Sequence, residues 1–135
     1  MKINLERIDD GFGMKATAGN HELLLDTAEE FGGKDQGFRP MQLMLISLAG
    51  CSAIDIIHIL KKGRHTIGSY SSEVRASRRE AMPKIFEQID LVIKVDTDAS
   101  DAVLERAVQL TKTKYCSAFA VLEASAKVNL ILERA

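Results

Sequence analysis

The sequence predicts an α+β domain in which an antiparallel sheet wraps around one long, buried central helix. Three observations predict this class. Short strand-like segments open the chain, a nearly continuous apolar run extends from Pro40 to Lys62, and two long alternating segments follow it. A chain of 135 residues is long enough for one domain with its own core, so we expect a single domain over residues 1–135.

The first third of the chain has the pattern of three short strands followed by a loop. Residues 2–6 and 13–18 predict two partners of a hairpin, and residues 21–26 predict a third strand. Residues 31–39 are rich in glycine, which predicts a flexible loop. The long helix is expected to begin directly after this loop.

Residues 40–62 predict a helix with well-marked ends. Pro40 suits the first helical position, where a backbone N–H is not needed. Gly63 is the expected left-handed residue after the helix, and the cations within 61–65 favour the negative end of the helix dipole. Apolar residues cover almost the whole circumference, which indicates a buried helix. One small sheet cannot cover every side of it, so the sequence favours a homodimer that supplies a second sheet.

The remaining residues predict a hairpin, two helices and a last strand. Residues 69–80 and 85–96 alternate over long stretches and predict an antiparallel hairpin. Ser100 is the expected N-cap of a helix, a second short helix is expected over residues 116–123, and a closing strand over residues 126–132. The predicted order is therefore βββ-α-ββ-αα-β.

Composition and charge exclude several classes of protein. A net charge of −1 argues against nucleic-acid binding, which depends on phosphate neutralisation. The N-terminus lacks the apolar segment of a signal peptide, and no charge-free apolar run reaches the length of about 20 residues that a membrane span needs. We therefore expect a cytoplasmic protein with no membrane partner, in which a special use of cysteine is redox or catalytic.

Cys51 and Cys116 are the two cysteines of the chain, and each lies in an unusual setting. Cys51 falls within the most apolar stretch. Cys116 follows Lys112-Thr-Lys114-Tyr, where a helix is expected to begin, so the helix dipole and both lysines are expected to stabilise its thiolate. The residues alone leave two interpretations open: a redox pair, or two unrelated buried side chains.

The helix that carries Cys51 does not by itself activate the thiol. The positive end of the helix at Pro40 lies roughly 16 Å away. Asp55 and His58 share a face with Cys51; the carboxylate opposes ionisation of the thiol, whereas a protonated His58 favours it. These three residues also match a metal-ligand pattern, but the spacing is common by chance, and the sequence predicts neither a metal site nor a cofactor.

Both cysteine segments resemble motifs of the osmotically inducible protein C and organic hydroperoxide resistance (OsmC/Ohr) superfamily. The first is a glycine-containing loop, a proline and a leucine-rich helix that leads to Ala-Gly-Cys, here Gly37 to Cys51. The second is a cysteine that starts a helix, here Tyr115-Cys116-Ser-Ala. The order of elements is also similar along essentially the whole chain. The residues that follow Cys51 look most similar to the YhfA-like branch.

The resemblance implies a thiol peroxidase in an intertwined homodimer, in which the N-terminal strands of each chain complete the partner's sheet. It implies that Cys51 attacks an organic hydroperoxide and becomes a sulfenic acid, and that Cys116 condenses with it to a disulfide at the subunit interface. An external dithiol, such as a lipoyl protein, then reduces the pair.

Two positions depart from the organic hydroperoxide branch of the family. That branch carries a glutamate just after the helix-start proline, where this chain has Met41 followed by Gln42. It also carries an arginine in the N-terminal strands, and residues 16–21 contain none. Arg39 is the candidate substitute, and Arg39, Met41 and Gln42 are the expected substrate-binding residues. The departures keep two alternatives open: a non-catalytic dimeric protein that binds a small apolar or thiol-containing ligand, and a slow redox sensor.

Overall fold

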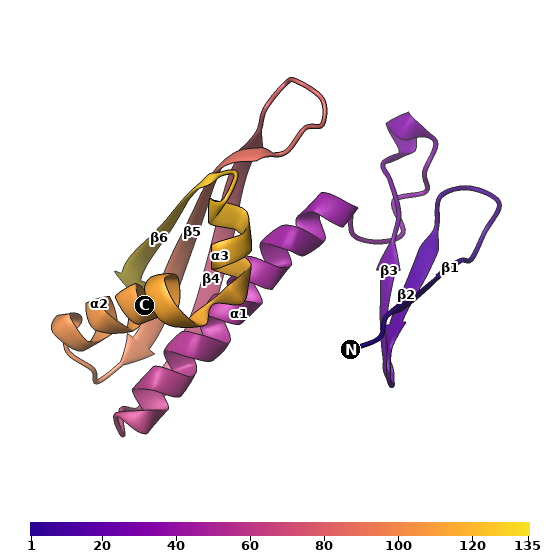
Figure 1. Ribbon diagram of the computed structural model, residues 1–135. Coiled ribbons are helices and arrows are strands. Elements are labelled where there is room, and N and C mark those ends of the chain that lie inside the picture. Colours follow the sequence, from indigo (N-terminus) through magenta and orange to yellow (C-terminus); the bar gives the residue numbers. More distant parts are fainter. The chain divides into compact units, whose positions relative to one another are not determined.

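The computed structural model describes residues 1–135, and the chain forms two compact units, Met1–Met44 and Leu45–Ala135 (Figure 1). The predicted order of strands and helices is confirmed, with two short additions, a 3₁₀ helix before the long helix and a π-helical turn after the second helix. The α+β class is confirmed as well.

The N-terminal unit contains a three-stranded antiparallel sheet. Its strands are β1 (Asn4–Arg7), β2 (Met14–Ala18) and β3 (His21–Leu25), in the spatial order of the sequence. A 3₁₀ helix, η1 (Glu29–Phe31), follows β3. Each strand lies within one or two residues of its predicted bounds, since alternation is a local property of the sequence.

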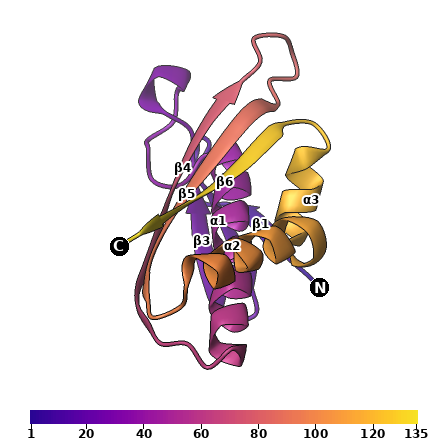
Figure 2. The ribbon, with the colours of Figure 1, turned by 90° about the vertical axis from the view of Figure 1, so that its left-hand side faces the viewer.

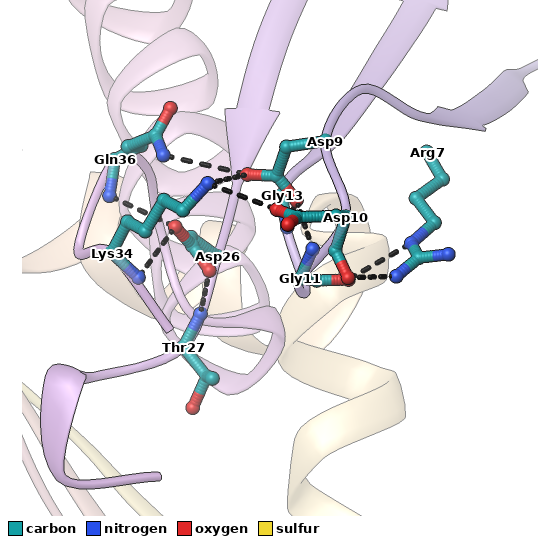
Figure 3. Close-up of polar contacts among 9 residues, drawn as sticks. All are labelled: Arg7, Asp9, Asp10, Gly11, Gly13, Asp26, Thr27, Lys34 and Gln36. Atoms are coloured by element: carbon teal, nitrogen blue, oxygen red, sulfur yellow. Dashed lines mark hydrogen bonds and ion pairs between the residues drawn. The ribbon is translucent and has the colours of Figure 1, made fainter. Parts of the chain in front are cut away.

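The loop after β3 is organised by one buried carboxylate (Figure 3). Asp26 is only 4% exposed, and its side chain accepts hydrogen bonds from the backbone N–H groups of Thr27 (2.7 Å), Lys34 (3.1 Å) and Gln36 (3.2 Å). The Lys34 ammonium group also pairs with Asp9 at 3.6 Å, which links the loop to the turn after β1. Burial opposes ionisation of Asp26, but the three N–H donors outweigh it and lower the pKa of the carboxyl group.

Helix α1 spans Pro40–Lys62, as predicted, but its C-terminal end differs from the prediction. Gly63 is not the left-handed residue; Arg64 is, with φ 63°. The N–H of His65 bonds to the carbonyl of Leu60 at 3.0 Å, and the N–H of Arg64 bonds to that of Lys61 at 2.9 Å. This pair of bonds is a Schellman motif with Arg64 at C′, one residue later than expected.

Within one chain, α1 is buried along a single stripe and not on all sides. Its fully buried residues follow a four-residue spacing: Leu48, Ser52, Ile56 and Leu60. The opposite side is open, and Ile54 is 71% exposed. A single chain therefore leaves one side of the helix uncovered, as expected for one small sheet, and burial of that side by a second copy stays a prediction. By length and composition alone, α1 is also the one helix apolar enough to cross a membrane, with a mean hydropathy of 2.1, a property that core helices of soluble proteins share.

The C-terminal unit contains a second three-stranded sheet, β4 (Ile67–Arg78), β5 (Phe86–Thr97) and β6 (Lys127–Arg134), with β5 in the centre. The predicted β4–β5 hairpin is antiparallel, but β6 pairs with β5 in parallel, so the sheet is mixed and not purely antiparallel. The reason is the helical connection between β5 and β6, which returns the chain to the end of the sheet where β5 begins.

The helices of this unit cover one face of the β4–β5–β6 sheet (Figure 2). They are α2 (Asp101–Leu110) and α3 (Ser117–Glu123), together with α1. Ser100 caps α2, as predicted, because its hydroxyl accepts the N–H of Val103 at 3.3 Å. Alternate residues of β5 face the helices and are completely buried: Ile89, Leu91, Ile93 and Val95.

We predict that Asp26→Asn lowers the free energy of unfolding near pH 7, because an amide lacks the charge that the three N–H groups stabilise. The folded pKa of Asp26 is lowered, so this stabilisation is present above the ordinary aspartate pKa of about 4 and is lost as the pH falls through the lowered value. Urea unfolding of both proteins at neutral and strongly acidic pH measures the difference, which should shrink in acid. Glu30→Gln, an exposed carboxylate nearby, serves as control; an equal difference at both pH values would contradict the assignment.

Candidate thiol site

The long helix supplies three polar side chains to the core side of the C-terminal unit. Ser52 lies on the buried stripe of α1, and Cys51 and Asp55, one helical turn apart, flank it. Cys51 is half-buried and unpaired with any disulfide partner. The helix thus presents a thiol, a hydroxyl and a carboxylate at one place.

Cys116 is positioned by an irregular turn at the end of α2. The chain leaves α2 through a π-helical turn, η2 (Thr111–Tyr115), and the N–H of Cys116 bonds to the carbonyl of Thr111 at 2.9 Å. Cys116 is then the N-cap of α3, and its sulfur accepts the N–H of Phe119 at 3.3 Å. Its side chain is 3% exposed, so the helix start that the sequence predicts lies inside the core.

These two segments bring both sulfurs and one carboxylate together. The Sγ atoms of Cys51 and Cys116 and a carboxylate oxygen of Asp55 all lie within 4.8 Å of one another. The hydroxyl of Ser52 contacts the sulfur of Cys116 at 3.7 Å. All four residues belong to one chain and one compact unit, so the sulfurs meet without a second subunit.

The environment of Cys116 favours the thiol over the thiolate. Burial raises the pKa of Cys116 most, a hydrogen bond with the Cys51 thiol raises it further, and the Phe119 N–H and the Ser52 hydroxyl oppose this in part. The prediction that two lysines stabilise a Cys116 thiolate is therefore wrong. Lys112 lies over the Phe119 ring at 5.9 Å and Lys114 over the Tyr115 ring at 5.3 Å, so their ammonium groups have aromatic partners.

One carboxylate oxygen of Asp55, Oδ2, is both buried and without a hydrogen-bond partner. Burial raises the pKa of Asp55, and the nearby His58 lowers it in part. A small pocket of about 110 Å³ opens beside this carboxylate; its lining residues are Asp55, His58, Ile59, Lys62 and Tyr115. A second, wider groove of about 520 Å³ lies between α2 and β6, and neither cysteine lines it.

Three side chains of the site group closely, and they differ from the three residues that share a helix face in the sequence. Cys51 and Asp55 group with Cys116, whereas His58 lies outside the set. The group offers three ligand atoms to an ion such as Zn²⁺, which takes four protein ligands in structural sites.

The three expected substrate-binding residues lie in the N-terminal unit, whereas both cysteines lie in the C-terminal unit. The side chain of Gln42 accepts the backbone N–H of Arg39 at 2.9 Å, which is half of a capping box at the start of α1. The Arg39 guanidinium pairs with Asp35 at 2.5 Å and with the carbonyl of Gly37 at 3.2 Å. Met41 is half-buried.

Sequence reasoning missed two buried hydroxyl groups, those of Ser52 and Tyr70. The four-residue spacing of Leu48, Ser52 and Ile56 could have shown that a serine lies on the buried stripe of the helix. The hydroxyl of Tyr70 on β4 is buried without a partner, and burial raises its pKa to about 12. Only the tertiary structure shows that, because alternation in a strand does not tell which phenol is desolvated.

Comparisons with known proteins agree on the family. The profile of the family described as OsmC-like protein matches residues 33–131. Protein YhfA of Escherichia coli (strain K12) is 35% identical over 114 residues, which cover 84% of this chain and 82% of YhfA.

Solved structures share the fold along the whole chain. A hypothetical protein from Aquifex aeolicus VF5 has a TM-score of 0.86 and 29% identity, with 99% of this chain and 95% of that chain covered. The organic hydroperoxide resistance protein OhrB of Bacillus subtilis has a TM-score of 0.69 and 18% identity, with 98% and 96% covered. These structures extend the match to the residues outside the family profile.

We predict that iodoacetamide modifies Cys51 faster than Cys116 in the folded, reduced protein near pH 7, because Cys116 is buried and little of it is thiolate. Ser52→Ala should slow the modification of Cys116 further, since it removes a hydrogen bond that favours the thiolate. Peptide mass mapping over time measures both rates, and the same reaction in urea, where the two thiols should react alike, is the control. Equal rates in the folded protein would contradict this description.

Proposed function

This chain is a member of the OsmC-like protein family, and we propose that it reduces organic hydroperoxides with Cys51 and Cys116. The observation that carries the proposal is the approach of the two sulfurs to within 4.8 Å inside one chain. The likeness to a protein named for organic hydroperoxide resistance supports the choice of substrate class.

The two cysteines differ in a way that suits two successive roles. Cys51 is the more exposed, so its thiolate attacks the O–O bond of the hydroperoxide and takes one oxygen. The alkoxide leaves and becomes an alcohol on protonation. The buried Cys116 then attacks the sulfur of the Cys51 sulfenic acid, which forms the disulfide and releases water. An external dithiol, for which a lipoyl protein is the candidate, returns both cysteines to thiols by two exchange steps.

The proposal places Arg39, Met41 and Gln42 on the substrate side of the site, as the matching family positions imply. Arg39 is paired with Asp35, so it would have to exchange that carboxylate for the substrate or for Cys51. Met41 adds apolar surface where the organic hydroperoxide branch has a glutamate, which favours an apolar hydroperoxide over hydrogen peroxide.

We further propose a cytoplasmic homodimer in which a second copy covers the open side of α1. OsmC/Ohr family proteins are generally dimeric. The open side of α1 carries Ile46 (46% exposed) and Ile54 (71% exposed), and exposed apolar surface of this kind is typical of an interface. Intertwining of the N-terminal strands is part of the same proposal.

The alternative is a dimeric protein that binds a small apolar or thiol-containing ligand without turnover, or one that is oxidised slowly as a sensor. Met41 in place of the family glutamate favours it, as does the raised pKa of Cys116. Mass spectrometry after one equivalent of peroxide separates thiol oxidation from simple binding, because disulfide formation removes two hydrogens from each chain and binding changes no covalent mass. A time course of the same reaction separates a fast peroxidase from a slow sensor.

We predict that the protein consumes cumene hydroperoxide in the presence of dihydrolipoamide, and that Cys51→Ser abolishes the reaction. Cys116→Ser should consume one equivalent rapidly and then stop, because its sulfenic acid has no resolving thiol. A peroxide assay with the FOX reagent measures both phases. Equal peroxide consumption by wild type and Cys51→Ser would contradict the proposal.

We also predict that the protein sediments at twice its chain mass of 14.9 kDa, and that Ile54→Asp shifts it toward the monomer. The carboxylate that this substitution introduces would lose its water when the second copy covers it, which costs several kcal/mol. Val121→Asp, at an exposed apolar residue of α3 (66% exposed), is the matched control and should leave the dimer intact. Analytical ultracentrifugation measures the masses; a monomeric wild type would contradict the dimer.

A further inference from the structure

Deprotonation of the buried resolving thiol, Cys116, requires a group other than the two cysteines. Cys116 must lose its proton to attack the Cys51 sulfenic acid, yet burial keeps it protonated. Lys112 and Lys114 lie over aromatic rings, and no lysine is among the groups that shift the pKa of Cys116. The Ser52 hydroxyl stabilises a thiolate but is no base near neutral pH. A proton acceptor within the site is therefore required.

Asp55 is the carboxylate within reach of both sulfurs. Its oxygen, the Cys51 sulfur and the Cys116 sulfur lie within 4.8 Å of one another, close enough for a small rotation or one water to complete a hydrogen bond. Its Oδ2 is buried without any hydrogen-bond partner. Such a group destabilises the folded state, and in folded proteins it often marks a functional residue. An acceptor that is free of protein donors is available to a proton.

The surroundings of Asp55 also connect its carboxyl group to solvent. The groups that face it are the two thiols, His58 and Lys62 on α1, and Tyr115 on the π-helical turn, and these last three line the small pocket beside it. A proton on Asp55 can thus pass to solvent through this pocket. Burial raises the pKa of the carboxyl group, which makes its carboxylate a stronger base.

We propose that Asp55 is the acid–base residue of the thiol pair: it accepts the proton of Cys116 when the disulfide forms and donates a proton to Cys116 when the disulfide is reduced. This inference rests on the proposed function for its peroxide step.

The step balances as follows. The Asp55 carboxylate removes the S–H proton of Cys116, and the electron pair of that bond forms the new bond to the Cys51 sulfur. The S–O bond of the sulfenic acid breaks, and the departing hydroxide takes the proton from Asp55 and leaves as water. In reduction, the Asp55 carboxylate accepts the S–H proton of the incoming dithiol as its sulfur attacks Cys51. The S–S bond breaks, and Asp55 passes that proton to the Cys116 thiolate that leaves.

The decisive variant is Asp55→Asn, which keeps the shape of the side chain and removes its basicity. After peroxide addition it should form the Cys51 sulfenic acid at the wild-type rate but close the disulfide about 10²-fold more slowly or worse. The sulfenic acid should then persist, react with dimedone, and advance to the sulfinic acid when peroxide is in excess. Rapid-quench mass spectrometry resolves all of these species. Glu123→Gln, an exposed carboxylate at the end of α3, is the matched control and should behave as wild type.

The pH profile separates proton transfer from a structural role. Disulfide closure in the wild type should level off above the pKa of Asp55, whereas in Asp55→Asn it should rise about tenfold for each pH unit through neutrality, because hydroxide becomes the base. Asp55→Glu should restore part of the wild-type profile, and it replaces Asp55→Asn as the test if that variant does not fold. A wild-type rate and profile for Asp55→Asn, or no restoration by glutamate, would overturn the inference.

Thiol–disulfide exchange distinguishes this inference from the proposed function. Oxidised glutathione should form the Cys51–Cys116 disulfide by exchange without any peroxide, and Asp55→Asn should slow that reaction and its reversal too. Peroxide-inert wild type together with slow exchange in Asp55→Asn would end the peroxidase proposal and retain the role of Asp55. Exchange at the wild-type rate would end the role of Asp55 whatever the peroxide result.

Discussion

Everything at the thiol site depends on the contact between the buried stripe of α1 and the turn that ends in Cys116. Helical spacing places Leu48, Ser52, Ile56 and Leu60 in one line, and burial of each large apolar side chain contributes roughly 2 kcal/mol. That stabilisation holds a serine, a thiol and a carboxylate at the core, where isolated polar groups would otherwise be disfavoured. The π-helical turn then directs Cys116 at them.

The same burial divides the labour between the two cysteines. Cys51 is partly exposed, whereas Cys116 is buried and its pKa is raised. In the proposed reaction, Cys51 therefore meets the substrate and Cys116 stays protonated until Cys51 is oxidised. A resolving thiol that stays protonated reacts slowly with oxidants in solution. It needs a base at the step in which it attacks the sulfenic acid. In the proposed mechanism, that base is Asp55, whose unpartnered oxygen lies on the helix that also carries Cys51. The site is thus organised around proton control as much as around sulfur proximity.

Much of the fold could be predicted because its signals are local. The bounds of α1, the β4–β5 hairpin and the Ser100 cap follow from periodicity and from single residues at helix ends. The parallel pairing of β6 could not be predicted in this way, since it depends on the route of the connection over the sheet. The left-handed residue Arg64 was missed because glycine is only the preferred residue at C′.

The sequence predicted which cysteines belong to the candidate site, but it did not predict their ionisation. The two cysteine segments pointed to a pair, and the structure brings the sulfurs together. The ionisation of Cys116 was predicted with the wrong sign, because a helix start and nearby lysines are visible in the sequence whereas desolvation is not. Likewise, Asp55 was expected only to oppose ionisation of Cys51; its buried, unpartnered oxygen is a property of the packed state.

The central claim is that the two sulfurs form one redox couple within a single chain. A crystal structure of the protein after treatment with one equivalent of organic hydroperoxide tests it most directly. The account predicts continuous density between the Cys51 and Cys116 sulfurs of the same chain, at the bond length of about 2.05 Å that disulfides have. Two separate sulfurs, with Cys51 oxidised beyond the sulfenic acid or Cys116 joined to another chain, would contradict it.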